Sequence, residues 1–246
     1  MRERFFVALS FYTRIPCPQN LNYKKLPQAS VFLPLIGWVV GAFLAGTFYL
    51  THLIWSQNSA ILLTLIVSVF LTGALHEDGF ADVCDGFGGG FDKTRILEIM
   101  KDSHSGVFGF IGLLLLFLLK ISALNELSAS VIPVVFFAGQ SVSRLAPLAL
   151  MFKYDYAREH NSKIIGATYK LNKKEGLFAL FLGLLPLLLL PTICLWVVVP
   201  LLLANFFLGR YFYHRIGGYT GDCLGASQQI SEVIFYLSLS AIWKFI

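Results

Sequence analysis

Long apolar runs separated by short polar segments dominate the chain. The runs are 15 to 25 residues long, close to the ~20 residues that an α-helix needs to cross a bilayer. Lipid offers no hydrogen-bond partner to an open strand edge, so segments this apolar are expected to be helices. We predict an all-α, polytopic membrane bundle of about seven transmembrane helices. The expected spans are 31–55, 59–75, 106–124, 130–151, 176–190, 191–209 and 232–246.

Two parts of this pattern allow alternatives. Only Leu190-Pro191 separates the fifth and sixth runs, so the pair could be one broken helix. The first residues resemble a secretory signal, but their apolar run has only eight residues and no small-x-small cleavage site follows. We therefore interpret 1–30 as an interfacial N-terminal segment of one domain, 1–246.

The basic residues predict the orientation of this bundle. Of the 19 Lys and Arg residues, 16 fall in the N-terminal segment and in three long loops. Basic loops stay on the cytoplasmic side of a membrane, so we expect the N-terminus to be cytoplasmic. The three loops are an acidic segment at 76–105, a basic loop at 152–175 and a Gly-rich segment at 210–231, whereas 55–58 and 125–129 are expected outside.

Composition narrows the class of protein further. The chain of 246 residues is 57% hydrophobic and only 13% charged, about half the charged share of an average soluble domain. Its four cysteines are scattered and form no C-x-x-C pair, which indicates neither a zinc site nor a disulfide framework. An ordinary soluble domain, a disordered chain and a disulfide-rich secreted scaffold are thereby excluded.

Acidic residues concentrate in one segment. Seven of the 14 lie between residues 77 and 102. Asp78, Asp82 and Asp85 follow an i, i+4, i+7 spacing, which on a helix places them within an arc of about 60°. Three such carboxylates repel one another unless a cation compensates. Oxygen-only ligands favour Mg²⁺, Mn²⁺ or Ca²⁺, and Mg²⁺ commonly shares phosphate oxygens; a solvated acidic loop is the alternative.

A second candidate segment, Gly217-Gly-Tyr-Thr-Gly-Asp-Cys-Leu-Gly-Ala226, precedes the last span on the same expected side. Backbone amides of such a turn can bind phosphate, and Asp222 could add a metal ligand; a turn that only ends a helix is the alternative. Three acids on one helix cannot surround a diphosphate. We therefore expect the Asp222 carboxylate within about 10 Å of Asp82 or Asp85, close enough for a shared metal site. The candidate phosphate-binding residues are Gly218, Thr220 and Gly221.

Several cationic side chains are candidates for phosphate binding or proton transfer. Arg144 lies inside a span, where an unpaired cation is costly, so an acid such as Asp82 or Asp102, or a substrate phosphate, is expected beside it. Arg14 and Arg158 could bind substrate, or could anchor anionic lipids. Lys101 precedes Asp102 in the acidic segment.

Taken together, these motifs resemble the cobalamin synthase family, adenosylcobinamide-GDP ribazoletransferase. The matching pieces occur in the family's order. They are Phe11-Tyr-Thr-Arg-Ile-Pro16, Phe32-Leu-Pro-Leu-Ile-Gly37, His76-Glu-Asp-Gly-Phe-Ala-Asp-Val-Cys-Asp-Gly86, Arg95-Ile-Leu-Glu-Ile-Met-Lys-Asp-Ser103, Gly106-Val-Phe-Gly109, Tyr156-Ala-Arg158 and 217–226. Two positions depart from the family pattern, which usually has an apolar residue at Glu77 and often an arginine at His104.

The resemblance implies an Mg²⁺-dependent transferase of the bacterial cytoplasmic (inner) membrane, with its active site facing the cytoplasm. It would join adenosylcobinamide-GDP to α-ribazole, or to its 5′-phosphate, and release GMP. Its partners would be these substrates and the lipid bilayer, with no nucleic acid; a homo-oligomer or association with other cobamide-assembly enzymes stays open. The expected metal ligands are Asp78, Asp82, Asp85 and Asp222; the catalytic residues are Asp82, Lys101 and Asp102, the last as general base; the substrate-binding residues are Arg14, Glu77, Arg144, Arg158, Gly218, Thr220 and Gly221.

Two other functions compete with this interpretation. A CDP-alcohol phosphotransferase also uses an Asp-x-x-Asp-Gly stripe, present here as 82–86, but the chain lacks the Ala-Arg and the later Gly-x-x-x-Asp-x-x-x-Asp of that class. A cation-coupled transporter would place carboxylates within its spans, whereas here they gather at one rim.

Overall fold

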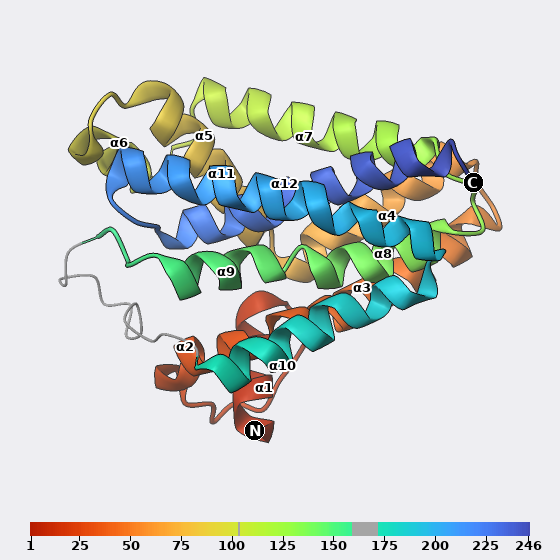
Figure 1. Cartoon of the computed structure of the whole chain (residues 1–246), viewed down its shortest axis with the longest axis horizontal. Coiled ribbons are helices and arrows are strands. Elements are labelled where there is room, and N and C mark those ends of the chain that lie inside the picture. Colours follow the sequence, from red (N-terminus) through yellow and green to blue (C-terminus); the bar gives the residue numbers. More distant parts are fainter. Residues whose placement is uncertain (103, 159–171) are drawn as a thin grey trace.

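A computed structural model describes residues 1–102, 104–158 and 172–246 of the chain. Within those ranges the protein is helical and contains no strand, only an isolated bridge between Tyr156 and Tyr219. The long helices lie side by side along the long axis of the molecule (Figure 1). The prediction of an all-α bundle is confirmed.

The α-helices follow one another with short connections. In chain order they are α1 (Arg2–Tyr12), α2 (Leu26–Ala29), α3 (Leu33–His52), α4 (Gln57–Thr72), α5 (Leu75–Gly89), α6 (Lys93–Ile99), α7 (Val107–Asn125), α8 (Ile132–Val142), α9 (Leu145–Lys153), α10 (Lys173–Leu184), α11 (Val198–Ile216) and α12 (Gly221–Trp243). Short 3₁₀ turns are η1 (Tyr23–Lys25), η2 (Ser30–Phe32), η3 (Leu185–Leu189) and η4 (Thr192–Val197).

Four helical stretches are long and apolar enough to cross a membrane. They are Tyr23–His52, Val107–Asn125, Ile132–Lys153 and Thr192–Ile216, and α4 with α5 makes a fifth if that bent pair is counted as one span. Within the described residues, length and composition therefore identify fewer membrane-spanning helices than the predicted seven. α10 has only 12 residues before a 3₁₀ turn replaces it, and polar side chains lower the hydropathy of α12. At Leu190-Pro191 the two predicted runs form separate elements.

The break between α4 and α5 has a local cause. Gly73 and Ala74 both adopt left-handed backbone angles, with φ of 66° and 58°, so the chain leaves α4 and turns by 91° into α5. Left-handed backbone is ordinary for glycine and costly for alanine. The Arg14 side chain packs directly on Gly73, and the Arg14 amide donates to the Leu71 carbonyl at 2.7 Å. These contacts hold the bend that places α5 at one end of the bundle.

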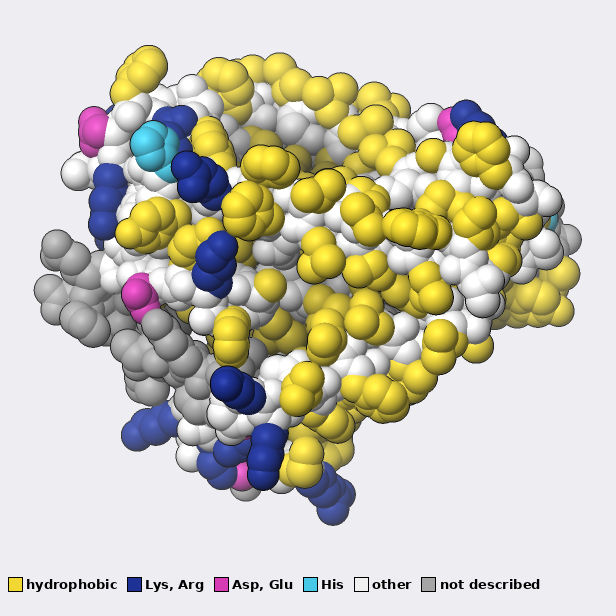
Figure 2. Space-filling view, viewed as in Figure 1, with side chains coloured by type: hydrophobic (Ala, Val, Ile, Leu, Met, Phe, Trp, Pro, Cys, Tyr) yellow, Lys and Arg dark blue, Asp and Glu magenta, His cyan; other side chains and the backbone are white. Residues whose placement is uncertain are grey.

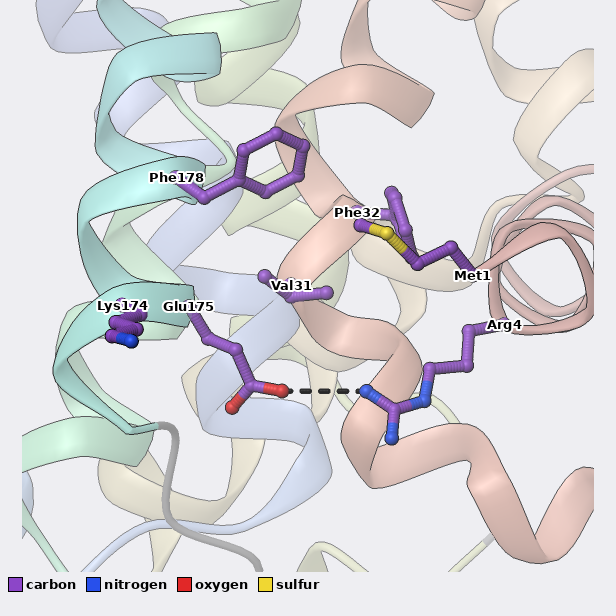
Figure 3. A pocket seen from close by; sticks show the side chains of 7 residues that line it. All are labelled: Met1, Arg4, Val31, Phe32, Lys174, Glu175 and Phe178. Carbon is purple, nitrogen blue, oxygen red and sulfur yellow. Dashed lines mark hydrogen bonds and ion pairs between the residues drawn. The ribbon is translucent and has the colours of Figure 1, made fainter.

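α12 is the central helix. It packs against α5, α7, α8, α9 and α11 (Figure 1), and its interior face carries polar as well as apolar side chains. α1 docks at the edge of the bundle instead. There Arg4 pairs with Glu175 of α10 at 3.3 Å, beside a cavity of about 210 Å³ that Phe32 and Phe178 help to line (Figure 3).

The surface divides into an apolar band and a basic end. Hydrophobic side chains cover most of one face, whereas the Lys and Arg side chains gather around α6 and over α1, α2 and the start of α10 (Figure 2). Exposed residues of the band include Phe110, Leu114 and Leu118 of α7 and Leu202 and Phe206 of α11. Such a large exposed apolar surface fits a membrane protein. The predicted basic loop at 152–175 falls partly, at 159–171, outside the described residues.

Candidate active site

The acidic stripe of α5 runs from the surface into the bundle. Asp78 is exposed, Asp82 is half-buried and Asp85 is buried. The Asp85 carboxylate accepts hydrogen bonds from the backbone amides of Gly106, at 2.7 Å, and Gly109, at 2.8 Å. Both carboxylate oxygens therefore already accept hydrogen bonds at the N-terminus of α7, where backbone amides lack partners within the helix. Asp85 fixes α7 to α5, and its role as a metal ligand stays a prediction.

The Gly-rich segment forms the turn between α11 and α12. Gly217 ends α11 with a φ of 78°, and Gly218 lies so close to the Asp155 carbonyl that no side chain would fit. The Tyr219 amide donates to the Asp155 carbonyl at 3.1 Å. Thr220 then caps α12 by accepting a hydrogen bond from the Cys223 amide at 3.3 Å. The turn thus places Asp222 in the first turn of α12.

α5 and α12 meet backbone against backbone. A Cβ atom placed on Gly79 would lie 3.0 Å from the Cα and the carbonyl oxygen of Asp222. One turn further along α12, a Cβ atom on Gly225 would lie 3.2 Å from the His76 carbonyl oxygen. The structure therefore brings together the two segments that the sequence separates by about 140 residues.

Two donors hold the Asp222 carboxylate. Arg158 Nη2 donates to Asp222 Oδ2 at 2.8 Å, and the Thr220 hydroxyl donates to the same oxygen at 3.2 Å. Arg158 also reaches the Met100 carbonyl at 3.5 Å. Lys101 and Asp102 follow Met100 and are exposed, so the end of the acidic segment borders the Arg158–Asp222 pair.

Negative charge is in excess around Asp82, which lies outside the four apolar spans. Burial, together with the charges of Asp222, Asp78 and Asp85, raises the pKa of Asp82 from its ordinary 3.8 to about 7. Burial also raises the pKa of Asp222, although Arg158 acts in the opposite direction. At the exposed end of the segment, a hydrogen bond from His104 lowers the pKa of Asp102; its Oδ1 lies 2.6 Å from His104 Nδ1.

This donor set fits Mg²⁺ in chemistry. Asp78, Asp82 and Asp222 offer only oxygen ligands, which hard divalent cations prefer, and their mutual repulsion is what such a cation would relieve. In the described ranges, no three His, Cys, Asp or Glu side chains already converge as the ligands of one metal ion. Water and substrate oxygens would thus complete the coordination, which is usual for Mg²⁺.

The other predicted residues divide into accessible and buried ones. Gly221 is exposed and has open space around it, and Arg14 is exposed at the α4–α5 bend. Glu77 and Arg144, by contrast, are 6% and 0% exposed. Arg144 Nη1 donates to the carbonyl and the side-chain oxygen of Gln140, rather than to Asp82 or Asp102. Both side chains lie in the bundle interior, because their helix faces pack on neighbouring helices. Their expected role in substrate binding stays a prediction.

The sequence interpretation missed one participant of that interior. Lys120 of α7 is 2% exposed and pairs with Glu232 of α12 at 3.1 Å. The sequence feature that could have identified it is a single cation within a 19-residue apolar helix, where a buried acidic partner is expected.

Comparison with known proteins identifies relatives along almost the entire chain. Residues 4–240 match the protein family described as cobalamin-5-phosphate synthase. A protein of Shewanella amazonensis named adenosylcobinamide-GDP ribazoletransferase is 42% identical over 98% of this chain and 96% of its own length. Proteins of the same name from Shewanella frigidimarina (43% identity; 97% and 94% coverage) and Leptospira interrogans (38%; 98% and 96%) are also similar. No solved structure matches.

Proposed function

Because the chain belongs to the cobalamin-5-phosphate synthase family, we propose that it is an adenosylcobinamide-GDP ribazoletransferase, which joins cobinamide to ribazole in cobalamin biosynthesis. One structural observation supports this proposal most strongly. The acidic face of α5 and the Asp222 end of α12 lie in direct contact, with Arg158 bound to Asp222. Carboxylates and a cation around one surface suit a diphosphate substrate.

The proposed reaction is a phosphoryl-type transfer. A ribose hydroxyl oxygen of α-ribazole, or of its 5′-phosphate, forms a bond to the phosphorus that carries the cobinamide arm. The bond from that phosphorus to the GMP oxygen breaks, and GMP leaves. The hydroxyl proton passes to a carboxylate, for which Asp102 is the candidate because it is exposed beside the Arg158–Asp222 pair.

Residues of both helices would bind the diphosphate. Asp78, Asp82 and Asp222, with Asp85 as a further predicted ligand, would hold Mg²⁺, which when bound neutralises the diphosphate and stabilises charge on the departing GMP. Arg158 can orient a phosphate while it stays bound to Asp222. Gly221 leaves the first turn of α12 open to a large ligand, and backbone amides at a helix N-terminus favour an anion. Positioning and electrostatics would supply most of the catalysis.

The proposed location is the bacterial inner membrane, with this end of the bundle in the cytoplasm. Supporting it are the apolar helices and the basic side chains, which gather around α6 and over α1 and α2 (Figure 2). A cytoplasmic site would face the water-soluble nucleotide product. The basic N-terminal segment would then lie on the same side.

An assay with purified protein in liposomes tests the function. With adenosylcobinamide-GDP and α-ribazole, we expect a cobalamin product and one GMP per turnover, detected by chromatography of both products. EDTA should abolish the reaction and added Mg²⁺ should restore it. Product formation that is unaffected by EDTA would contradict the metal requirement, and GMP release without a corrinoid product would contradict the proposed acceptor.

A further inference from the structure

A connected set of buried polar side chains lies beneath the candidate site. Lys120 Nζ contacts Glu232 Oε1 at 3.1 Å and donates to Gln229 Oε1 at 2.7 Å. Gln229 Nε2 donates in turn to Glu77 Oε1 at 3.0 Å. These four residues, at most 6% exposed, link α7, α12 and α5, and we call them the buried network.

Neighbouring side chains hold Glu232 in place. Gln228 Nε2 and the Tyr236 hydroxyl each donate to a Glu232 oxygen at 3.0 Å, and Gln228 also donates to Ser143 at 3.0 Å. Arg144, fully buried, lies within electrostatic range of both Glu77 and Glu232. Two cations, Lys120 and Arg144, thus face two carboxylates, so the interior charge is balanced.

This arrangement is costly for stability alone. Removing two charges from water costs more than their attraction returns in many proteins, and well-packed apolar residues often replace a buried ion pair without loss of stability. A reason other than stability is therefore needed for placing Lys120 and Glu232 inside an apolar bundle. Directional hydrogen bonds fix the register of two helices in a way that apolar contacts do not.

The network is attached to the two helices that carry the site. Glu77 directly precedes Asp78 in α5, and Gln229 lies seven residues, or about 10 Å, along α12 from Asp222. Between the network and the site, Gly79 and Gly225 bring the two backbones together. A small slide or rotation of α12 would thus displace Asp222 relative to Asp78 and Asp82.

We propose that Lys120, Glu232, Gln229 and Glu77 are positioning residues, which fix α12 against α5 and thereby align Asp222 with the acidic stripe for catalysis. This inference rests on the proposed function. None of the four touches the substrate in this proposal; they act through Asp78, Asp82 and Asp222. The double variant Lys120→Met/Glu232→Gln tests it, because it removes both charges, keeps similar volumes and leaves Arg144 balanced by Glu77.

Its control exchanges the same residue types in a second ion pair. Lys244 and Glu126, 3.6 Å apart and exposed, also join the ends of α12 and α7, so Lys244→Met/Glu126→Gln removes an equivalent pair far from α5. We expect both double variants to insert into membranes and to unfold within about 4 °C of the wild type, the shift that accompanies a free-energy change of ~1 kcal/mol in a chain of this size.

The two variants should differ in function. The network variant should lose at least tenfold in kcat, with KM for the corrinoid changed less than threefold. A misaligned Asp222 carboxylate should reduce the stabilisation of the transition state more than it reduces substrate binding. Without substrates, the rise in Tm that Mg²⁺ produces in the wild type should be lost in this variant and kept in the control.

A folded network variant with wild-type kcat and Mg²⁺ response would overturn the positioning role. So would equal losses in both double variants. If the network variant unfolds, a second variant tests the proposal. Gln229→Met removes the hydrogen bonds of Gln229 to Lys120, Glu77 and Gln228 but keeps the Lys120–Glu232 ion pair. It must still lower kcat with the wild-type Tm, or the proposal fails. An inactive wild type in the same assay would instead contradict the proposed function, while the Mg²⁺-dependent Tm would still report on the alignment.

Discussion

Among the acidic residues of α5, Asp82 has the environment that best suits a metal ligand. Asp78 is exposed, and both oxygens of Asp85 accept hydrogen bonds from backbone amides. Asp82 is half-buried among three other carboxylates, and burial with their charges raises its pKa to about 7. The ionised form of Asp82 is therefore costly in the metal-free protein and would be stabilised by a divalent cation.

Replacing Asp82 should consequently lower the activity of the protein and raise the stability of its metal-free form. Asp82→Asn is expected to lower product formation at least 100-fold, because a neutral amide is a poor ligand for Mg²⁺. Without Mg²⁺ at pH 8, the same variant should unfold about 2–4 °C higher, as a gain of ~1 kcal/mol would produce in a chain of this size. The measurements are product chromatography and thermal unfolding in detergent.

The pH dependence of that gain follows from linkage. The pKa of Asp82 is higher in the folded protein than the ordinary 3.8, so between these values the folded state binds more protons than the unfolded chain, and stability falls as pH rises. The gain from Asp82→Asn should therefore be largest at pH 8 and shrink toward pH 4. Glu98→Gln, on the exposed face of α6, is the control; an Asp82→Asn variant no more stable than this control at pH 8 would contradict the argument.

At the scale of elements, the site depends on how closely α5 and α12 approach. Their contact is made through glycines, since a Cβ atom on Gly79 would meet the Asp222 backbone at 3.0 Å. The bend at Gly73 and Ala74 places α5 in this position, and Asp85 fixes the N-terminus of α7. The site is thus a junction of three helices and not a property of one.

Adding one methyl group at this junction should impair catalysis. Gly79→Ala is expected to push α12 away from α5 and to lower kcat about tenfold, a loss of ~1.4 kcal/mol in transition-state stabilisation. Gly46→Ala, in α3 with open space around it, should keep full activity and gain up to ~1 kcal/mol in stability from the better helix former. Kinetic assays and thermal unfolding of both variants provide the comparison; equal kcat values would show that the close approach is dispensable.

At the scale of the whole molecule, the apolar band and the basic end define how the bundle would sit in a membrane. The band covers most of one face, and the basic side chains gather around α6, next to α5, and over α1 and α2 (Figure 2). Because positively charged segments stay in the cytoplasm, the candidate site would meet its substrates there.

Reporter fusions test this orientation. A reporter fused after residue 90 should lie on the cytoplasmic side of the membrane, and reporters inserted at 55–58 or 125–129 should lie on the external side. Paired fluorescent-protein and phosphatase fusions at each position give opposite readings for the two sides. Phosphatase activity from the fusion after residue 90 would reverse the orientation and move the site to the external face.

Local features of this protein were readable from the sequence. Apolar runs predicted helices because lipid and the bundle core both require internal backbone hydrogen bonds. The i, i+4, i+7 spacing predicted that Asp78, Asp82 and Asp85 share one helix face, because helix geometry alone places residues at this spacing on the same side. The family resemblance rested on seven matching pieces in the family's order, of which 76–86 and 217–226 are the most specific, and the relatives confirm it.

Only the tertiary structure decided which neighbours these residues have. Nothing in the local pattern required Glu77 to bind Gln229, 152 residues away, or Lys120 to meet Glu232. By residue type, Arg144 and Glu77 could equally have been accessible substrate ligands. Their helix faces pack against other helices, however, so both side chains are buried. Sequence spacing fixes the face of a helix on which a side chain lies, whereas the packing of distant helices determines whether that face meets substrate, lipid or another charge.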